Sequence, residues 1–135
     1  MLSDLVKNPG GTVAGHIARV GEKSICTSLI AAAELRYGAA KSQSVKITDR
    51  VDLVLSAIEI LALEAPTDHH YAEIRHHLTS RGTPIGPNDL LIAAQALAND
   101  LVVVTANVSE FGRVPGLALE NWLMKTPTDY ASMQP

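Results

Sequence analysis

The chain has 135 residues, which suits one domain with its own core. Hydrophobic residues make up 47% and aromatic residues 4%, so we expect an aliphatic core, and the net charge of −3 excludes a general attraction to phosphate. A single cysteine, Cys26, excludes an internal disulfide and favours a reducing compartment. With no signal segment and no run near the roughly 20 apolar residues of a membrane span, we expect a cytoplasmic protein without membrane association.

The first half of the chain predicts short helices interrupted by two strands. The helices are expected at residues 1–7, 13–20, 28–38 or 28–42, and 45–56, and the strands at 24–27 and 58–63. Gly21 ends the second helix, and Ser28 is a good N-cap for the third. The apolar residues that share a face are Leu29, Ala33 and Tyr37 in the third helix and Val51, Leu55 and Ile58 beyond it.

The second half predicts two longer helices and a buried strand. Thr67 is expected to cap a helix that carries Tyr71, Ile74 and Leu78 and ends at 81–82. The segment 87–98 is a helix that starts on a proline, with an apolar stripe of Leu90, Ala94 and Leu97.

The run 101–104 has no alternation, as in a parallel strand covered on both faces, and a last strand is expected near 117–119. The alternation of helices and strands predicts an α/β sandwich with a mainly parallel sheet. Residues 1–123 are expected to form one domain and residues 124–135 a loosely held tail.

Four polar residues are candidates for a shared site. Asp89 lies at the start of a helix, at the rim where α/β sheets usually place their chemistry, and Asn107 and Glu110 follow the last core strand at the same edge. Glu34 lies mid-helix with no cation at i±3 or i±4. Such oxygens suit Mg²⁺. Each also has a structural interpretation: a solvated Glu34 or Glu110, a helix-dipole partner at Asp89, turn chemistry at Asn107.

Other chemistries find little support. His69 and His76, like His70 and His77, are seven residues apart, about 10 Å along a helix, which is too far to share one zinc ion. The chain has no nucleophile elbow, P-loop or dinucleotide fingerprint. The cations near the acids in sequence are Arg36, Arg81 and Arg113, which are candidates for RNA binding or simply solvated charges.

Three segments, 28–38, 86–94 and 104–111, resemble in order and spacing the PIN-domain ribonucleases, specifically the VapC toxins of toxin–antitoxin pairs. The motif 83–87 and the Leu-Glu-Asn-Trp that ends at Trp122 add to the match. The resemblance implies an α/β/α sandwich, a homodimer, a Mg²⁺ or Mn²⁺ site, cleavage of RNA (often tRNA) and neutralisation by a VapB-like antitoxin. It also implies that Glu34 and Asp89 are catalytic acids and metal ligands, with Asn107 as a ligand and Glu110 as the following acid.

One departure from the family bears on function. Family members begin with a strand that ends in Asp-Thr-Asn. This strand supplies the first catalytic acid and forms the middle of the sheet. We expect both the strand and its acid to be absent here. Asp4 does not match that acid. A PIN-like sandwich without its first strand could be an impaired ribonuclease or a non-catalytic module that binds antitoxin or self-associates. A generic α/β ligand-binding domain is a third hypothesis.

Overall fold

A computed structural model of the chain describes residues 1–123, and the expected tail, 124–135, lies outside the described residues. The helices in chain order are α1 (Leu2–Lys7), α2 (Thr12–Val20), the 3₁₀ turn η1 (Glu22–Ser24), α3 (Leu29–Ser42), α4 (Val45–Ala57), α5 (Thr67–Ser80), α6 (Pro87–Ala98) and α7 (Val108–Phe111). The strands are β1 (Cys26–Ser28), β2 (Glu59–Leu61), β3 (Val103–Val104) and β4 (Leu119–Glu120).

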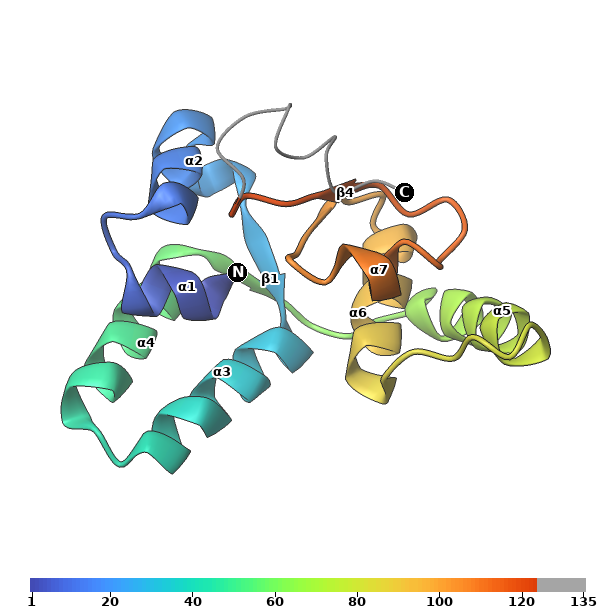
Figure 1. Cartoon of the computed structure of the whole chain (residues 1–135), viewed down its shortest axis with the longest axis horizontal. Coiled ribbons are helices and arrows are strands. Elements are labelled where there is room, and N and C mark those ends of the chain that lie inside the picture. Colours follow the sequence, from blue (N-terminus) through green and yellow to red (C-terminus); the bar gives the residue numbers. More distant parts are fainter. Residues whose placement is uncertain (124–135) are drawn as a thin grey trace.

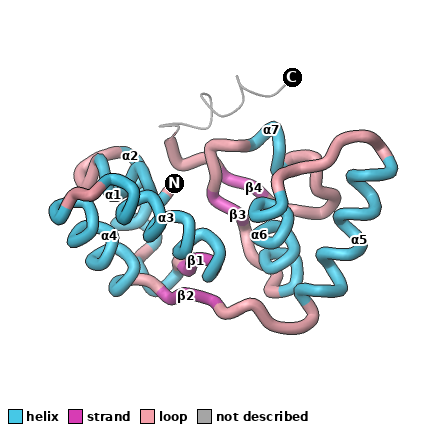
Figure 2. Tube along the Cα trace, turned by 90° about the horizontal axis from the view of Figure 1, so that it is seen from below, coloured by secondary structure: helices cyan, strands magenta, loops and turns pink. Residues whose placement is uncertain are grey.

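The strands form two separate parallel pairs within residues 1–123. β1 pairs with β2, with Thr27 opposite Ile60, and β3 pairs with β4, with Val103 opposite Leu119. Figure 2 shows both pairs in the middle of the molecule with helices around them. The expected mainly parallel arrangement and α/β class are confirmed, but no hydrogen-bonded strand joins the two pairs in the described part of the chain.

The core is likewise divided in two. One apolar cluster lies between α1, α3 and α4 and is built on the buried residues Val6, Ala32, Ala39, Val51 and Leu55. The other joins α5 and α6 to β3 and the segment after it, with Leu78, Leu90, Ala93, Ala94 and Phe111 among its members. Figure 1 shows α1 to α4 gathered on one side and α5 to α7 on the other.

Gln95 ties the two halves together. Its side chain is 2% exposed, and Nε2 donates to the carbonyls of Leu61 and Ala62 at 3.1 and 3.0 Å. These carbonyls lie at the end of β2 and just after it, so helix α6 holds the chain as it passes from one half to the other. Burying an amide is favourable only when its polar atoms find partners, and here the NH₂ group finds two.

The caps predicted from the sequence are largely confirmed. The Ser28 hydroxyl accepts from the Ile30 N–H at 3.1 Å, and Pro87 occupies the first position of α6. Gly21 ends α2 at a φ of 87°, and Gly82 follows the α5 C-cap at 69°, a left-handed conformation that glycine adopts without a Cβ penalty.

Several local predictions were wrong. The run 101–104 is not covered on both faces, because Leu101 and Val102 are 36% and 48% exposed and only the last two residues form β3. Thr67 is the first residue of α5 rather than its cap, which is Pro66. No helix was predicted after residue 98, but residues 108–111 form the short helix α7.

The face shared by Leu29, Ala33 and Tyr37 on α3 is open to solvent, and Ala32 and Ala39 face the core instead. A helix with small residues on every side can pack by either face, so its spacing alone did not decide which one is buried.

None of the helices in the described part of the chain is long and apolar enough to span a membrane.

Candidate active site at the start of helix α6

Asp89 is placed by the start of α6. Pro87 and the Gly86 carbonyl, which accepts from the Leu90 N–H at 2.9 Å, fix the first turn, and Asp89 is its only acidic residue. The side chain is half-buried, since α6 packs against α5 on one side and α3 on another. A carboxylate at a helix N-terminus is stabilised by the helix dipole, but partial burial works against the charged form.

Glu110 approaches the same turn from α7. Its Oε1 accepts from the Gly86 N–H at 2.6 Å, and its Oε2 accepts from the Asn107 side-chain amide at 2.5 Å. Asn107 is in turn positioned by its own N–H, which donates to the Thr105 hydroxyl at 3.0 Å. Residues 24 positions apart therefore meet at the entrance to α6.

The pKa values of Asp89 and Glu110 are shifted in opposite directions at the start of α6. Burial, followed by the charge of Glu110, a hydrogen bond between the two carboxyl groups and the charge of Glu34, raises the pKa of Asp89 to about 6. The Gly86 N–H, followed by the Asn107 amide, lowers the pKa of Glu110. Glu110 therefore stays ionised, and the excess proton affinity of the site resides on Asp89.

Glu34 is the more distant member of this group, which we call the acid cluster: Glu34, Asp89 and Glu110. It lies on the exposed side of α3, close enough to Asp89 to raise its pKa, but in fourth place among the causes. The charge of Glu34 on α3 therefore acts on Asp89 of α6, but less strongly than the charge of Glu110.

The acid cluster fits a divalent cation of the Mg²⁺ type. Its donors are carboxylate and amide oxygens, and the pKa of Asp89 is raised by burial and by the neighbouring carboxylates. Within residues 1–123, however, no three His, Cys, Asp or Glu side chains stand close enough to enclose one ion. Mg²⁺ usually keeps several waters and needs only one or two protein carboxylates, so the donors fit an open site rather than a closed cage.

The three predicted RNA-binding arginines lie in different settings. Arg113 Nη1 donates to the Pro84 carbonyl at 3.2 Å, and its charge helps to lower the pKa of Glu110, so this cation borders the acid cluster. Arg36 instead pairs with Asp52 of α4 at 2.8 Å. Arg81 is the exposed C-cap residue of α5.

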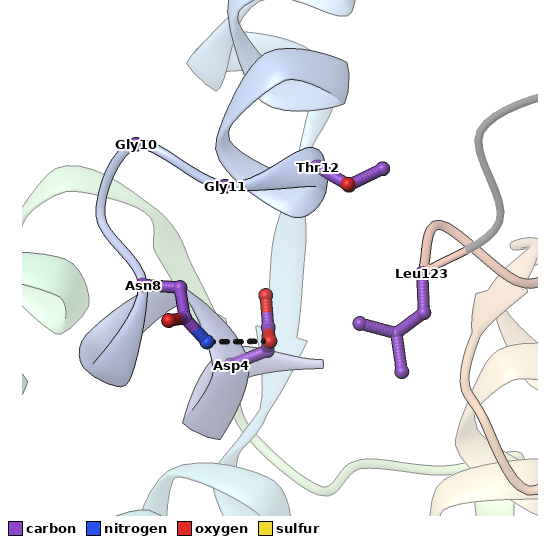
Figure 3. Close-up of a pocket in the computed structure, with 6 residues that line it drawn as sticks. All are labelled: Asp4, Asn8, Gly10, Gly11, Thr12 and Leu123. Atoms are coloured by element: carbon purple, nitrogen blue, oxygen red, sulfur yellow. Dashed lines mark hydrogen bonds between the residues drawn. The ribbon is translucent and has the colours of Figure 1, made fainter.

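A hollow of about 410 Å³ lies elsewhere, beside α1. It is lined by Asp4, Asn8, Gly10, Gly11, Thr12 and Leu123, none of which belongs to the acid cluster. Figure 3 shows the Asp4 carboxylate, which accepts from the Asn8 amide at 3.0 Å, facing Leu123 across this hollow. Asp4 was given no catalytic role from the sequence, and it lines this hollow with residues that are not members of the acid cluster.

One component of the site was not assigned a role from the sequence. The Gly86 N–H holds Glu110 in place, and a Cβ at Gly86 would lie 3.6 Å from the Glu110 Oε1. The only sequence signal was the Gly-Pro pair at 86–87, which indicates a turn but does not indicate which residue the turn contacts.

Comparison with known proteins identifies the class of protein to which this fold belongs. The PIN domain family model matches residues 10–117, and the chain belongs to this family. Within it, the chain is 43% identical over 100 residues to "Ribonuclease VapC2" of Rickettsia felis, covering 73% of this chain and 75% of that protein. It is 40% identical over 99 residues to "tRNA(fMet)-specific endonuclease VapC" of Salmonella typhimurium, with the same coverage.

A solved structure agrees with these relatives. The VapBC2 complex of Rickettsia felis, bound to a DNA fragment from its promoter, superposes with a TM-score of 0.84 at 35% identity, covering 90% of this chain and 92% of that one. The resemblance to VapC proteins drawn from the three sequence segments is therefore confirmed.

Proposed function

We propose that the chain is a metal-dependent endoribonuclease toxin of the VapC type, with the acid cluster as its active site. The observation that supports this most is the shared charge of Asp89, Glu110 and Glu34 at the start of α6. A half-buried carboxyl group whose pKa is raised by burial and by neighbouring carboxylates is typical of functional sites.

Each site residue has a role in this proposal. Asp89 and Glu34 hold the cation through their carboxylates, and Asn107 contributes its amide oxygen while its NH₂ group fixes Glu110. Glu110 orients the entrance turn and keeps its negative charge at neutral pH. When bound, Mg²⁺ or Mn²⁺ would supply Lewis-acid chemistry toward a phosphodiester.

The names of the relatives support a proposal for the substrate and the partners. The Salmonella protein is named for cleavage of tRNA(fMet), and we propose a tRNA as the RNA substrate here. Arg113, which borders the acid cluster, is the arginine best placed to contact RNA, with Arg36 and Arg81 as outer contacts. The VapBC complex among similar structures supports a VapB-like antitoxin as partner, and we propose a homodimer as the working form.

RNA cleavage by the purified full chain tests the proposal. The purified chain is incubated with a pool of 5′-labelled tRNA transcripts in separate reactions that contain Mg²⁺, Mn²⁺ or EDTA. We expect cation-dependent internal cleavage by the wild type, and a loss of at least about 100-fold in Asp89→Asn, the range typical of removing one electrostatic contact in a site. The matched control is Asp68→Asn, which changes an acid in the first turn of α5 and should retain activity.

A second candidate function is a non-catalytic PIN-like module that binds antitoxin or self-associates. It is favoured by the absence, among residues 1–123, of three ligating side chains close enough to enclose one ion. The same assay separates the two. Equal cleavage by wild type and Asp89→Asn would remove the assigned site, and no cation-dependent cleavage by a folded wild type would favour the second candidate.

A further inference from the structure

A small cavity borders the segment that carries Gly86, and the residues on both sides of Gly86 line it. It has a volume of about 240 Å³, below the roughly 300–1,000 Å³ of drug-sized ligand sites, so it suits a single flat ring system. Its walls are Leu78, Ile85, Leu90 and the rings of Pro84 and Pro87, and its polar rim is Tyr71, Arg75 and Thr79 of α5.

The rim carries an aromatic ring and a cation that are already arranged together. Arg75 Nη1 donates to the Tyr71 hydroxyl at 3.0 Å, and the guanidinium carbon lies 5.9 Å from the Tyr71 ring centroid. Within residues 1–123 no carboxylate lies within ion-pair distance of Arg75, and its side chain is exposed. Its full charge is therefore free to attract an anion.

The wall of the cavity is held by residues of the acid cluster and its border. Gly86, between the two lining residues Ile85 and Pro87, donates its N–H to Glu110, and the carbonyl of the lining residue Pro84 accepts from Arg113. The segment Pro84–Pro87 therefore lines the cavity and also contacts Glu110 and Arg113.

We infer that this cavity, defined by Tyr71, Arg75, Thr79 and the Pro84–Pro87 wall, is a nucleotide subsite that binds one unpaired base of the RNA next to the cleaved phosphate. The base lies against Tyr71 and the proline rings, and Arg75 pairs with a backbone phosphate at the rim. Aromatic stacking combined with a cation is the usual chemistry of single-stranded RNA binding, and it tolerates any base because every base has a π-face.

The subsite rests on the proposed function for its substrate class, but it can be tested without cleavage. Binding is measured with a single-stranded oligoribonucleotide that carries 2-aminopurine, in an Asp89→Asn background and in EDTA. Stacking on Tyr71 should quench the fluorescence of the base, and Arg75→Ala and Thr79→Glu should each weaken binding. We expect about 10-fold weaker binding for Tyr71→Leu, the scale of one lost base–aromatic stack.

Matched variants separate binding from folding. Tyr71 also packs against the core around α5 and α6, so Tyr71→Leu can lose stability, whereas Arg75 and Thr79 are exposed and their variants should fold like the parent. Tyr71→Phe should keep the quenching, because the ring remains. Lys46→Ala removes an exposed positive charge from α4 and should leave binding unchanged.

Unchanged binding in both Arg75→Ala and Thr79→Glu would overturn the subsite. So would conversion of a dimer to a monomer by these variants in sedimentation, because the cavity would then be a contact between two copies of the chain. In an active chain the same variants should raise KM and leave kcat nearly unchanged. If no chain cleaves RNA but Arg75→Ala still loses binding, the proposed function fails and the subsite stands.

Discussion

Asp89→Asn should stabilise the protein at neutral pH when no divalent cation is present. The ordinary pKa of an aspartate is 3.8, and in the folded protein burial and the charges of Glu110 and Glu34 raise the pKa of Asp89 to about 6. The folded state therefore binds the proton more tightly than the unfolded state, so stability falls as the pH rises from about 4 to about 6 and stays at the lower level above that range.

The size of the effect follows from the shift. A difference of about two units corresponds to about 3 kcal/mol between the two protonation states. Asp89 is more exposed than buried, so solvent screening reduces this, and we expect Asp89→Asn to gain about 1–2 kcal/mol in the free energy of unfolding at pH 7.5. Below pH 4 both proteins carry a neutral side chain at this position, and the gain should vanish.

Urea unfolding in EDTA at several pH values between 4 and 7.5 measures this difference. The control is Asp68→Asn in the first turn of α5, where loss of a helix-dipole interaction should cost about 0.3–1 kcal/mol, the opposite sign. An Asp89→Asn protein that is less stable than wild type at pH 7.5, or whose gain is the same at pH 4, would refute the reasoning from carboxylate repulsion.

Four further variants test other parts of the structure. Glu110→Gln removes the largest charge acting on Asp89, so the pKa of Asp89, followed by carboxyl ¹³C NMR, should fall below 6, and an unchanged value would contradict the contact. Gln95→Leu leaves the Leu61 and Ala62 carbonyls without their donor and should cost about 1–3 kcal/mol in urea unfolding; a neutral effect would mean that this amide does not join the halves. Gly38→Ala lies mid-helix in α3 with nothing within 4 Å of the added Cβ and should gain about 0.5–1 kcal/mol, whereas Gly112→Ala places its Cβ 2.5 Å from the Val108 carbonyl oxygen and should lose stability; a gain in both would refute the distinction.

The sequence was most informative where local chemistry decides the structure. Pro87, Ser28 and Gly21 fix helix ends through φ restriction, a hydroxyl cap and a left-handed turn, and these act within a few residues. The position of Asp89 in the first turn of α6 followed directly from Pro87, and so could be predicted without any knowledge of the tertiary structure.

Long-range contacts were beyond such reasoning. The Glu110 contact with the Gly86 N–H spans 24 residues, and no pattern in either segment predicts that the two segments meet. Arg36 was grouped with the acids by its nearness to Glu34 in sequence, yet it faces Asp52 on the neighbouring helix. Likewise the exposure of Leu101 and Val102 depends on which elements cover the run 101–104. The apolar composition of this run does not predict those elements.

Calorimetric titration of Mg²⁺ into the wild type and into Asp89→Asn, at pH 7.5, tests the acid cluster most directly. The cluster predicts measurable Mg²⁺ binding by the wild type, proton release on binding at pH 6 because the cation displaces the proton of Asp89, and at least about tenfold weaker binding by Asp89→Asn. Equal Mg²⁺ affinity in the two proteins, or no binding by a folded wild type, would contradict the assignment of a cation site to Asp89 and its neighbours.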